Sequence, residues 1–377
     1  MNCVNYKNRN EKNTTKGATR GAKDGVHPSL SRVPYRMATI MKASYFLGNQ
    51  AFEVREREIP RPGSGEVVIK NMACGVCGTD VHIYYGEPGS ADVTPPVVLG
   101  HEYSGEIVEV GEGVDGLKPG DHVTVDPNIY CGRCEYCRDG KKQLCESMQA
   151  VGVTRDGGFA QYSLVPQGQA FKLAEGVPFQ AGAMAEPLAC CLHGIDLAGI
   201  KPGQTVCVVG GGAIGLMMLQ LARLSGAGRV FLSEPNPKRR EAALALGADL
   251  AIDPADAQSR VQGENSADVV IECVGNHLAV ESAFAFANKG ATLVLFSVPK
   301  VDAVFPLPLF DLYKKELTVK GSFVNPDTHA RAVALINAGR VDFGPIITHR
   351  FGIGQLPEAI AAQQGSESIK VVVLPQE

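Results

Sequence analysis

The sequence predicts an α/β protein made of two parts, an antiparallel, barrel-like β domain and a parallel, doubly wound sheet. Short strands of mixed polarity, separated by Pro and Gly, fill the chain from Met41 to about residue 185. From about residue 201, strands without polar alternation take turns with helical patterns, which is typical of a parallel sheet. The last apolar strand, Ile369 to Leu374, is assigned back to the first part.

Length and composition exclude several classes of protein. The 377 residues suit two domains of ordinary size, and 45% hydrophobic residues allow large cores. The net charge of −4, without a long basic run in the body of the chain, argues against nucleic acid as the main partner. No apolar run approaches the roughly 18 residues of a membrane span, so no membrane partner is expected.

Residues 1–37 are predicted to be a disordered extension. They are polar, lack periodicity, and contain eight Lys or Arg against two acids, Glu11 and Asp24. The alternatives are an organelle-targeting peptide, or a start assigned too early, with Met37 or Met41 the true beginning. Because no apolar signal sequence is recognisable and the eleven cysteines are partly clustered, we expect a cytoplasmic protein.

The predicted strands of the first part combine β-branched or aromatic residues with polar ones. They are Lys42–Phe46, Glu66–Lys70 and Glu106–Val110. The predicted strands of the second part are Thr205–Val209, Arg229–Ser233, Asp268–Cys273 and Ala291–Phe296. Helices are predicted from Leu216 to Leu224 and from Pro237 to Leu246, the latter with Pro at its start and Gly247 just after its end.

Four cysteines form the most compact motif of the chain. Cys131, Cys134, Cys137 and Cys145 are separated by two, two and seven residues. Four thiolates at such spacings can close a tetrahedron around Zn²⁺, whereas ordinary buried or disulfide cysteines are the alternative. A closed four-thiolate site leaves no open position, so this zinc would be structural and the chemistry must lie elsewhere.

A glycine-rich turn predicts a dinucleotide site. Gly210, Gly212 and Gly215 enclose Ala213 and Ile214, follow a predicted strand and open a predicted helix. Glu234, 19 residues after Gly215, would accept hydrogen bonds from the adenosine ribose and repel a 2′-phosphate, which favours NAD over NADP. Arg239 and Arg240 lie nearby. They either weaken this preference or are solvated helix residues.

Three further motifs carry residue types that bind catalytic metals. Cys77-Gly-Thr79-Asp80-Val-His82 and Gly100-His101-Glu102 precede the four cysteines, and Ala185-Glu186-Pro187 follows them. With the glycine-rich turn, this order resembles the zinc-dependent medium-chain alcohol dehydrogenases over roughly residues 40–377. The Glu186-Pro-Leu motif is similar to the polyol (sorbitol-type) and threonine-dehydrogenase-like branches.

The resemblance implies a GroES-like β-barrel catalytic domain and a Rossmann doubly wound cofactor domain. We assign residues 38–189 and 330–377 to the first, with a structural zinc lobe at 126–148, and residues 190–329 to the second. It also implies a homodimer or homotetramer.

The resemblance implies a catalytic zinc held by Cys77 and His101. Glu102 would be the third ligand, while Glu186 would contact water in the open position or replace Glu102. Adjacent residues of a straight strand point in opposite directions, so His101 and Glu102 can share a metal only if the chain bends, which Gly100 permits.

The expected reaction is oxidation of an alcohol by hydride transfer to the nicotinamide. Thr79 would take the hydroxyl proton, and by resemblance His82 would pass it to solvent. A plain turn hydroxyl and a surface histidine are the respective alternatives. Asp80 either orients a ligand or is an ordinary turn acid. Val274, Gly275, Ser297 and Val298 follow predicted strands, where the nicotinamide is expected.

The substrate is the least determined feature. Sorbitol-type enzymes hold polyol hydroxyls with an Arg-Tyr pair, and the corresponding positions here are Val324 and Asn325. Tyr84, Tyr85 and Phe323 would line a pocket or simply pack. We expect a secondary alcohol or polyol, with a threonine-like β-hydroxy amino acid as the alternative substrate. A non-catalytic zinc-binding scaffold is the alternative from another class.

Overall fold

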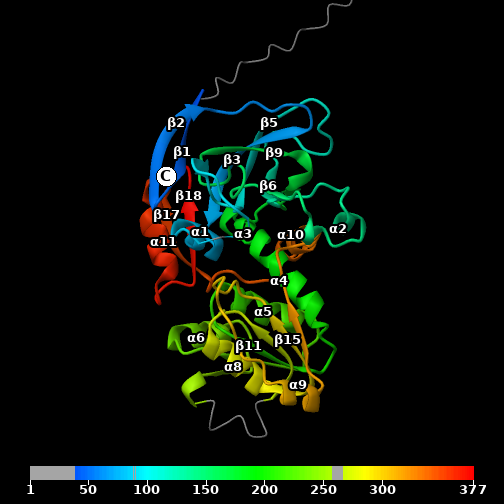
Figure 1. Cartoon of the computed structure of the whole chain (residues 1–377). Coiled ribbons are helices and arrows are strands. Elements are labelled where there is room, and N and C mark those ends of the chain that lie inside the picture. Colours follow the sequence, from blue (N-terminus) through cyan, green and yellow to red (C-terminus); the bar gives the residue numbers. More distant parts are fainter. Residues whose placement is uncertain (1–38, 88, 90, 257–265) are drawn as a thin grey trace, which may run out of the picture. The chain divides into compact units, whose positions relative to one another are not determined.

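The structure is a computed structural model of the chain and describes residues 39–87, 89, 91–256 and 266–377 (Figure 1). The predicted extension, residues 1–37, lies outside the described residues. The described chain contains a mixed seven-stranded sheet with a small three-stranded sheet, and a parallel six-stranded sheet. The predicted α/β class with two different β systems is therefore confirmed.

The first half of the chain is dominated by antiparallel pairing. The small sheet has the order β2 (Ala51–Glu58), β1 (Ile40–Gly48), β4 (Val97–Val98). The larger sheet has the order β10 (Ala170–Lys172), β6 (His122–Val125), β5 (Glu102–Val110), β3 (Glu66–Gly75), β18 (Lys370–Leu374), β17 (Ile347–Gly352), with β9 (Tyr162–Pro166) also pairing with β3. Buried side chains including Ile69, Tyr103, Ile107 and Val373 form the core of this half.

The last two strands add a parallel pair to this sheet. β17 pairs with β18 in parallel, although β18 pairs with β3 antiparallel. The connection between β17 and β18 contains α11 (Leu356–Gln364), and a crossover of this kind returns the chain in the same direction. The buried side chains Leu356, Ala359 and Ile360 pack this helix onto the first core.

Several short helices and strands lie between the main strands of the first half. They are α1 (Gly78–Tyr84), β7 (Asn128–Ile129), α2 (Glu135–Arg138), η1 (Lys142–Leu144), β8 (Gln149–Ala150), η2 (Gln167–Gln169), α3 (Phe179–Ala183) and η3 (Ile353–Gln355). Within the described ranges, we find no helix with both the length and the apolar character that crossing a membrane requires.

The parallel sheet is covered by helices on both faces. Its order is β13 (Leu250–Ile252), β12 (Arg229–Ser233), β11 (Thr205–Val209), β14 (Ala267–Glu272), β15 (Ala287–Leu295), β16 (Thr318–Gly321). Its helices are α4 (Ala185–Ala198), α5 (Ala213–Leu224), α6 (Pro237–Ala245), α8 (His277–Phe286) and α9 (Leu309–Lys315), while α10 (His329–Asn337) packs on α4. Val206 and Val208 belong to the hydrophobic core that the sheet shares with α4 and α5. Cys207 and Val209 belong to the core that the sheet shares with α8. Successive residues thus bury opposite faces, as a doubly wound sheet requires.

One helix runs across the boundary that we predicted between residues 189 and 190. α4 is continuous from Ala185 to Ala198 and ends at Gly199, whose φ of +64° is the left-handed conformation of a helix C-terminus. Leu188 and Leu192 of α4 share a core with Val333 and Ile336 of α10. The side chain at the start of α4, Glu186, is therefore carried by a rigid, packed helix.

His329 provides a test of the packing around α10. Its ring is buried against Phe171, and neither ring nitrogen has a hydrogen-bond partner. Burial lowers the pKa of His329 to about 3. Because the unfolded chain binds this proton near pH 6.5, the unfolding free energy falls as the pH drops from about 6.5 towards 3.

We therefore expect His329→Leu to reduce the loss of stability between pH 7 and pH 5 by about 2 kcal/mol, measured by urea unfolding. The exposed His277 supplies the control. His277→Leu should leave the change in unfolding free energy between pH 7 and pH 5 the same as in the wild type. An unchanged pH dependence in His329→Leu would contradict the assignment of a neutral buried imidazole.

Candidate metal centres and cofactor site

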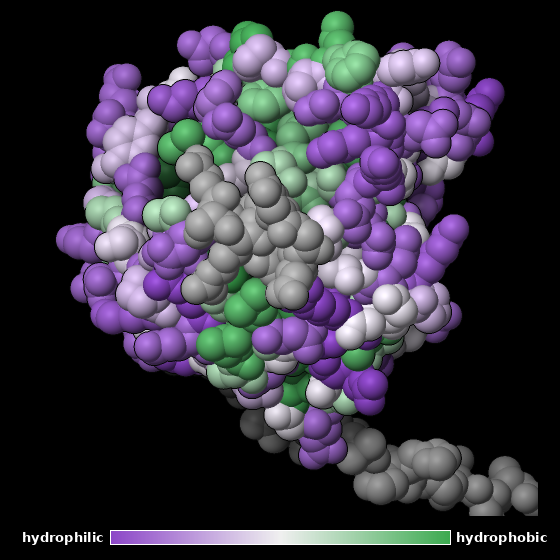
Figure 2. Space-filling view, turned by 90° about the horizontal axis from the view of Figure 1, so that it is seen from below, coloured by the Kyte–Doolittle hydropathy of each residue, from purple (hydrophilic) through white to green (hydrophobic). Residues whose placement is uncertain are grey.

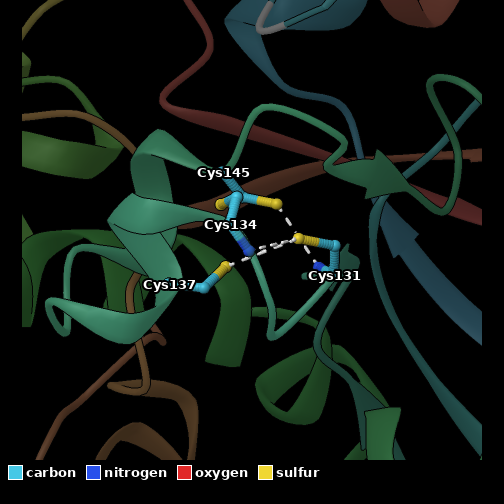
Figure 3. Close-up of side chains that lie close together, drawn as sticks. All are labelled: Cys131, Cys134, Cys137 and Cys145. Atoms are coloured by element: carbon cyan, nitrogen blue, oxygen red, sulfur yellow. Dashed lines mark hydrogen bonds between the residues drawn. The ribbon is translucent and has the colours of Figure 1, made fainter.

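The four predicted cysteines come together in one small lobe. The sulfurs of Cys131, Cys134, Cys137 and Cys145 lie within 4.8 Å of one another and point toward a common space (Figure 3). The N–H groups of Arg133 and Cys134 point at the Cys131 sulfur, at 3.5 and 3.3 Å. These two contacts lower the pKa of Cys131 to about 6, which favours the thiolate that binds zinc.

A second cluster joins residues that are distant in sequence. Cys77 precedes α1, His101 lies between β4 and β5, and Glu102 begins β5. The ligand atoms of these three side chains lie within 4.8 Å of one another, and His101 and Glu102 are buried. A thiolate, an imidazole and a carboxylate are the donors found in catalytic zinc sites, so the residues fit that metal.

A bend at Gly100 allows two adjacent residues to face the same point. Gly100 has φ +92°, and a Cβ there would approach the Cys74 sulfur at 2.8 Å and the Phe159 ring at 2.9 Å. No other residue type satisfies both the backbone conformation and this close packing. The bend that our reading of His101 and Glu102 requires is therefore present.

Asp80 contacts two members of this cluster, Cys77 and His101. One of its carboxylate oxygens accepts the N–H of Cys77 at 2.8 Å, and the other lies 3.7 Å from Nδ1 of His101. Burial would lower the pKa of His101, but the charges of Asp80 and Cys77 raise it well above its usual value. The buried carboxylate of Asp80 thus fits the orienting role that we considered, and not that of a solvated turn acid.

Lys370 is a residue of the site that sequence reasoning missed. Its ammonium group, on β18, forms a buried ion pair with Glu102. A Cβ at Gly75 would lie 2.2 Å from the Glu102 carboxylate and 2.9 Å from Cε of Lys370, so glycine leaves the room for this pair. The sequence did contain a signal for this residue, because a lysine inside the otherwise apolar run Ile369-Lys-Val-Val-Val is unusual.

Glu186 lies beside the second cluster but is not one of its members. It is buried at the start of α4, and the thiol of Cys190 donates to its Oε1 at 3.3 Å. Burial raises the pKa of Glu186 to about 7, against the opposing charge of His101. Cys190 therefore contacts a candidate site residue.

Thr79 and His82 lie on α1, three residues apart and on the same face of the helix. The Nδ1 atom of His82 is 2.5 Å from a carboxylate oxygen of Glu87. This acid, just beyond the helix, was another residue that the sequence motif did not indicate.

The glycine-rich turn has the geometry of a nucleotide-binding turn. Gly210 has φ +101°, and a Cβ at Gly215 would lie 1.9 Å from the carbonyl oxygen of Gly210. A Cβ at Gly212 meets nothing within 4 Å, so this residue faces open space at the beginning of α5. A phosphate group could approach the exposed N–H groups there.

The residues around Glu234 form a closed network. Its carboxylate accepts the N–H of Gly211 at 2.7 Å and of Asn236 at 2.8 Å. Arg239 donates to the carbonyl oxygen of Ser368 at 2.7 Å, and Arg240 contacts Asp253 at 3.0 Å. Both guanidinium groups are thus held by the protein, rather than being simply solvated.

The predicted nicotinamide side assembles at the ends of β14 and β15. A Cβ at Gly275 would lie 3.1 Å from the Ser297 hydroxyl and 3.3 Å from the Val298 carbonyl oxygen. Glu272, which sequence reasoning missed, accepts the N–H groups of Val274 and Gly275 at 2.6 and 2.8 Å. Its other oxygen accepts the Ser297 hydroxyl at 2.6 Å.

The tyrosines considered for the substrate pocket lie elsewhere. Tyr84 and Tyr85 line a cavity of about 550 Å³ next to α1, together with Phe46. This cavity does not include Cys77, His101 or Glu102. Phe323 is 42% exposed.

Comparison with known proteins agrees with this geometry. Residues 63–175 match the alcohol dehydrogenase GroES-like domain, and residues 213–338 match the zinc-binding dehydrogenase family. The chain is 36% identical to an L-threonine 3-dehydrogenase of Pyrococcus abyssi and 35% identical to a sorbitol dehydrogenase of Halalkalibacterium halodurans. Each match covers 90% of this chain and 99% of the relative.

A solved zinc-binding dehydrogenase of Sinorhizobium meliloti, bound to NADP, is 41% identical with a TM-score of 0.85. The match covers 90% of this chain and 100% of that structure. The fold and the two metal-ligand clusters define a zinc-dependent dehydrogenase. The chain belongs to the medium-chain alcohol dehydrogenase family, in its polyol and threonine dehydrogenase branch.

The ion pair of Lys370 and Glu102 yields a stability prediction. Lys370→Met leaves the Glu102 carboxylate buried without its partner, so we expect the unfolding free energy to fall by about 3–5 kcal/mol in metal-free protein. Zinc should restore part of this loss if Glu102 binds the metal.

Lys238, whose ion pair with Glu367 is 69% exposed on both sides, is the matched control. Lys238→Met should leave the unfolding free energy close to the wild-type value, because solvent screens an exposed ion pair. If the two substitutions lowered the unfolding free energy equally in chemical denaturation, the buried ion pair would contribute no more to stability than the exposed one.

Proposed function

We propose that this chain is a zinc-dependent, NAD-linked dehydrogenase that oxidises a secondary alcohol or polyol to a ketone. The observation that carries the proposal is the meeting of Cys77, His101 and Glu102 within 4.8 Å. The same chain has a nucleotide-binding turn at Gly210 to Gly215. A metal centre and a nicotinamide site are the two components that alcohol oxidation by hydride transfer requires.

Cys77, His101 and Glu102 would hold the catalytic zinc ion, and the four cysteines of the small lobe would hold a structural one. The catalytic ion supplies a Lewis acid that lowers the pKa of a bound hydroxyl group. Asp80 orients the imidazole of His101, and Lys370 balances the charge of Glu102. Glu186 is the alternative third ligand, but the grouping of ligand atoms supports Glu102.

Proton transfer is assigned to α1. The Thr79 hydroxyl, two residues after Cys77, would accept the proton of the substrate hydroxyl. His82 would pass it to solvent, with Glu87 holding the imidazole through the contact to Nδ1. A hydrogen-bonded carboxylate fixes the orientation of a histidine ring.

NAD is favoured over NADP by the acid at the end of β12. Glu234 is 5% exposed and held by the N–H groups of Gly211 and Asn236, so its charge stays beside the expected adenosine ribose. The contacts of Arg239 and Arg240 to carbonyl groups and Asp253 compete with binding of a 2′-phosphate. The NADP in the Sinorhizobium relative is the observation that opposes this preference.

The charge of the site supports a neutral substrate over threonine. Among the described residues, Lys370 is the only buried lysine or arginine, and it is paired with Glu102. Glu186 and Asp126 add further carboxyl groups near the metal site. The carboxylate of an amino acid would therefore lack a buried cationic partner, whereas the hydroxyl groups of an alcohol or polyol need none.

The proposal is tested by NADH formation from secondary alcohols, vicinal diols, sugar alcohols and L-threonine. We expect a neutral alcohol to give the highest kcat/KM and NAD to exceed NADP. Cys77→Ser should lower kcat/KM at least about a thousandfold, because the Lewis acid contributes several kcal/mol. Metal analysis should find about two zinc ions in the wild type and about one in this variant.

Cys134→Ser is the control for loss of a zinc ion as such. It should also retain about one zinc ion, with lower thermal stability but continued turnover, because its site is structural. Full activity in Cys77→Ser would contradict the catalytic metal site, and preference for L-threonine would contradict the substrate class.

We infer that the chain forms a homodimer through the open edge of the parallel sheet. β16 is an edge strand, and large apolar side chains are strongly exposed in and before α9, among them Val301, Val304, Phe310 and Tyr313. Figure 2, seen from below, shows hydrophobic areas between hydrophilic ones on this half. Pairing of two such edges would bury these groups.

Sedimentation equilibrium should give twice the mass of one chain, and a monomer mass would contradict the inference.

A further inference from the structure

The cavity beside Tyr84 and Tyr85, here called the α1 cavity, has a volume of about 550 Å³, which is in the range of small-molecule sites. Its walls come from three segments: the end of β1 with the turn that follows it, the end of α1, and the chain that leads to β4. None of the described residues that line it belongs to the two metal-ligand clusters or to the glycine-rich turn. The α1 cavity is therefore distinct from the candidate metal and cofactor sites.

The backbone on both sides of the α1 cavity is held by local geometry. A Cβ at Gly89 would lie 2.8 Å from Cγ2 of Thr79 and 3.1 Å from Ile83, so the segment after α1 packs tightly against that helix. On the other side, Asn49 and Gln50 have φ values of +48° and +59°. Two left-handed residues in succession are typical of a tight two-residue hairpin turn. The space between them is therefore bounded by two well-defined pieces of backbone.

Three aromatic side chains line the α1 cavity, and their rings are held in place. They are Phe46, Tyr84 and Tyr85. The Tyr84 ring stacks on Phe52 with centroids 5.8 Å apart, and it meets the Tyr85 ring edge to face at 5.2 Å. The Tyr85 hydroxyl donates to Oε1 of Gln364 at 3.0 Å. Rings that are fixed before binding cost little entropy when a ligand arrives.

The charged side chains of the lining are all acidic. Among the described residues that line the α1 cavity, Glu87 and Asp92 carry charge, and none is a lysine, arginine or histidine. Glu87 contacts His82, whereas no hydrogen bond or ion pair joins the Asp92 carboxylate to another described residue. An anion would be repelled by both carboxylates, and a cation would be attracted by them.

We propose that the α1 cavity binds an organic ammonium ion. The aromatic rings attract a cation at their faces, and Asp92 supplies the counter-charge, a combination suited to quaternary and alkyl ammonium groups. A bare metal cation is disfavoured, because aromatic rings offer it no oxygen ligands. The inference goes beyond the proposed function, since it assigns a second ligand whose binding needs neither alcohol nor NAD.

A ligand-observed NMR titration of the zinc-loaded protein with tetramethylammonium chloride tests the site. We expect a dissociation constant of about 1 mM, as is reasonable for so small a ligand. tert-Butanol is the matched neutral ligand, because it has nearly the same shape, carries no charge and, as a tertiary alcohol, cannot be oxidised to a ketone. It should bind at least about tenfold more weakly, since it lacks the cation–π and ionic attraction.

Two substitutions remove the two parts of the site separately. Tyr85→Leu removes a ring while keeping an apolar side chain, and Asp92→Asn removes a charge at nearly constant shape. Each should weaken tetramethylammonium binding at least about fivefold. Tyr85 is 45% exposed and Asp92 is exposed, so both variants should fold.

Tyr313→Leu and Asp115→Asn are the matched controls. Both residues are exposed and lie outside the α1 cavity, so the two variants should keep the wild-type affinity for tetramethylammonium. Equal affinities of the wild type for tetramethylammonium and tert-butanol, or no binding of either, would overturn the proposal. Wild-type affinity in both Tyr85→Leu and Asp92→Asn would overturn it as well. Because the titration involves no turnover, a failure of alcohol oxidation would contradict the proposed function alone.

Discussion

The catalytic half depends on the burial of opposite charges at Glu102. A carboxylate without a counter-charge is too costly in the interior of a protein, and Lys370 meets that requirement from the last strand. The ion pair brings together β5 and β18, which are separated by most of the chain and are both neighbours of β3. Glycine at position 75 leaves the space that the two side chains fill. The C-terminal strand therefore contributes to the candidate metal site as well as to the sheet.

Glycines and caps at the ends of strands explain how the remaining groups are placed. The bend at Gly100 turns His101 and Glu102 to one side, and the left-handed Gly210 begins the turn into α5. At both positions the backbone geometry excludes a side chain, so the local sequence carries the constraint directly. Glu234 then accepts the N–H of Gly211 in the glycine-rich turn, and Glu272 accepts the N–H groups of Val274 and Gly275 in the turn that follows it, which gives the cofactor site two ordered loops.

Many features were readable from the chain alone. β11 and β12 have the predicted bounds, since continuous apolar runs between turn residues identify buried parallel strands. The four cysteines were recognisable because the ligands of a structural zinc site are close in sequence. The parallel pairing of β17 with β18 was not readable, because it depends on where α11 packs and not on the pattern of either strand.

The sequence by itself determined the fold class, the glycine-rich turn and the candidate metal-binding side chains, because motif spacing and hydrophobic pattern are local properties. Only the tertiary structure decided that Lys370 balances Glu102, that Glu272 orders the end of β14, and that Asp126 and Asn128 clamp Asn325. Each of these contacts joins segments whose meeting depends on the packing of the whole core. Buried polar groups must find partners wherever the chain brings them, and no local pattern specifies which partner that is.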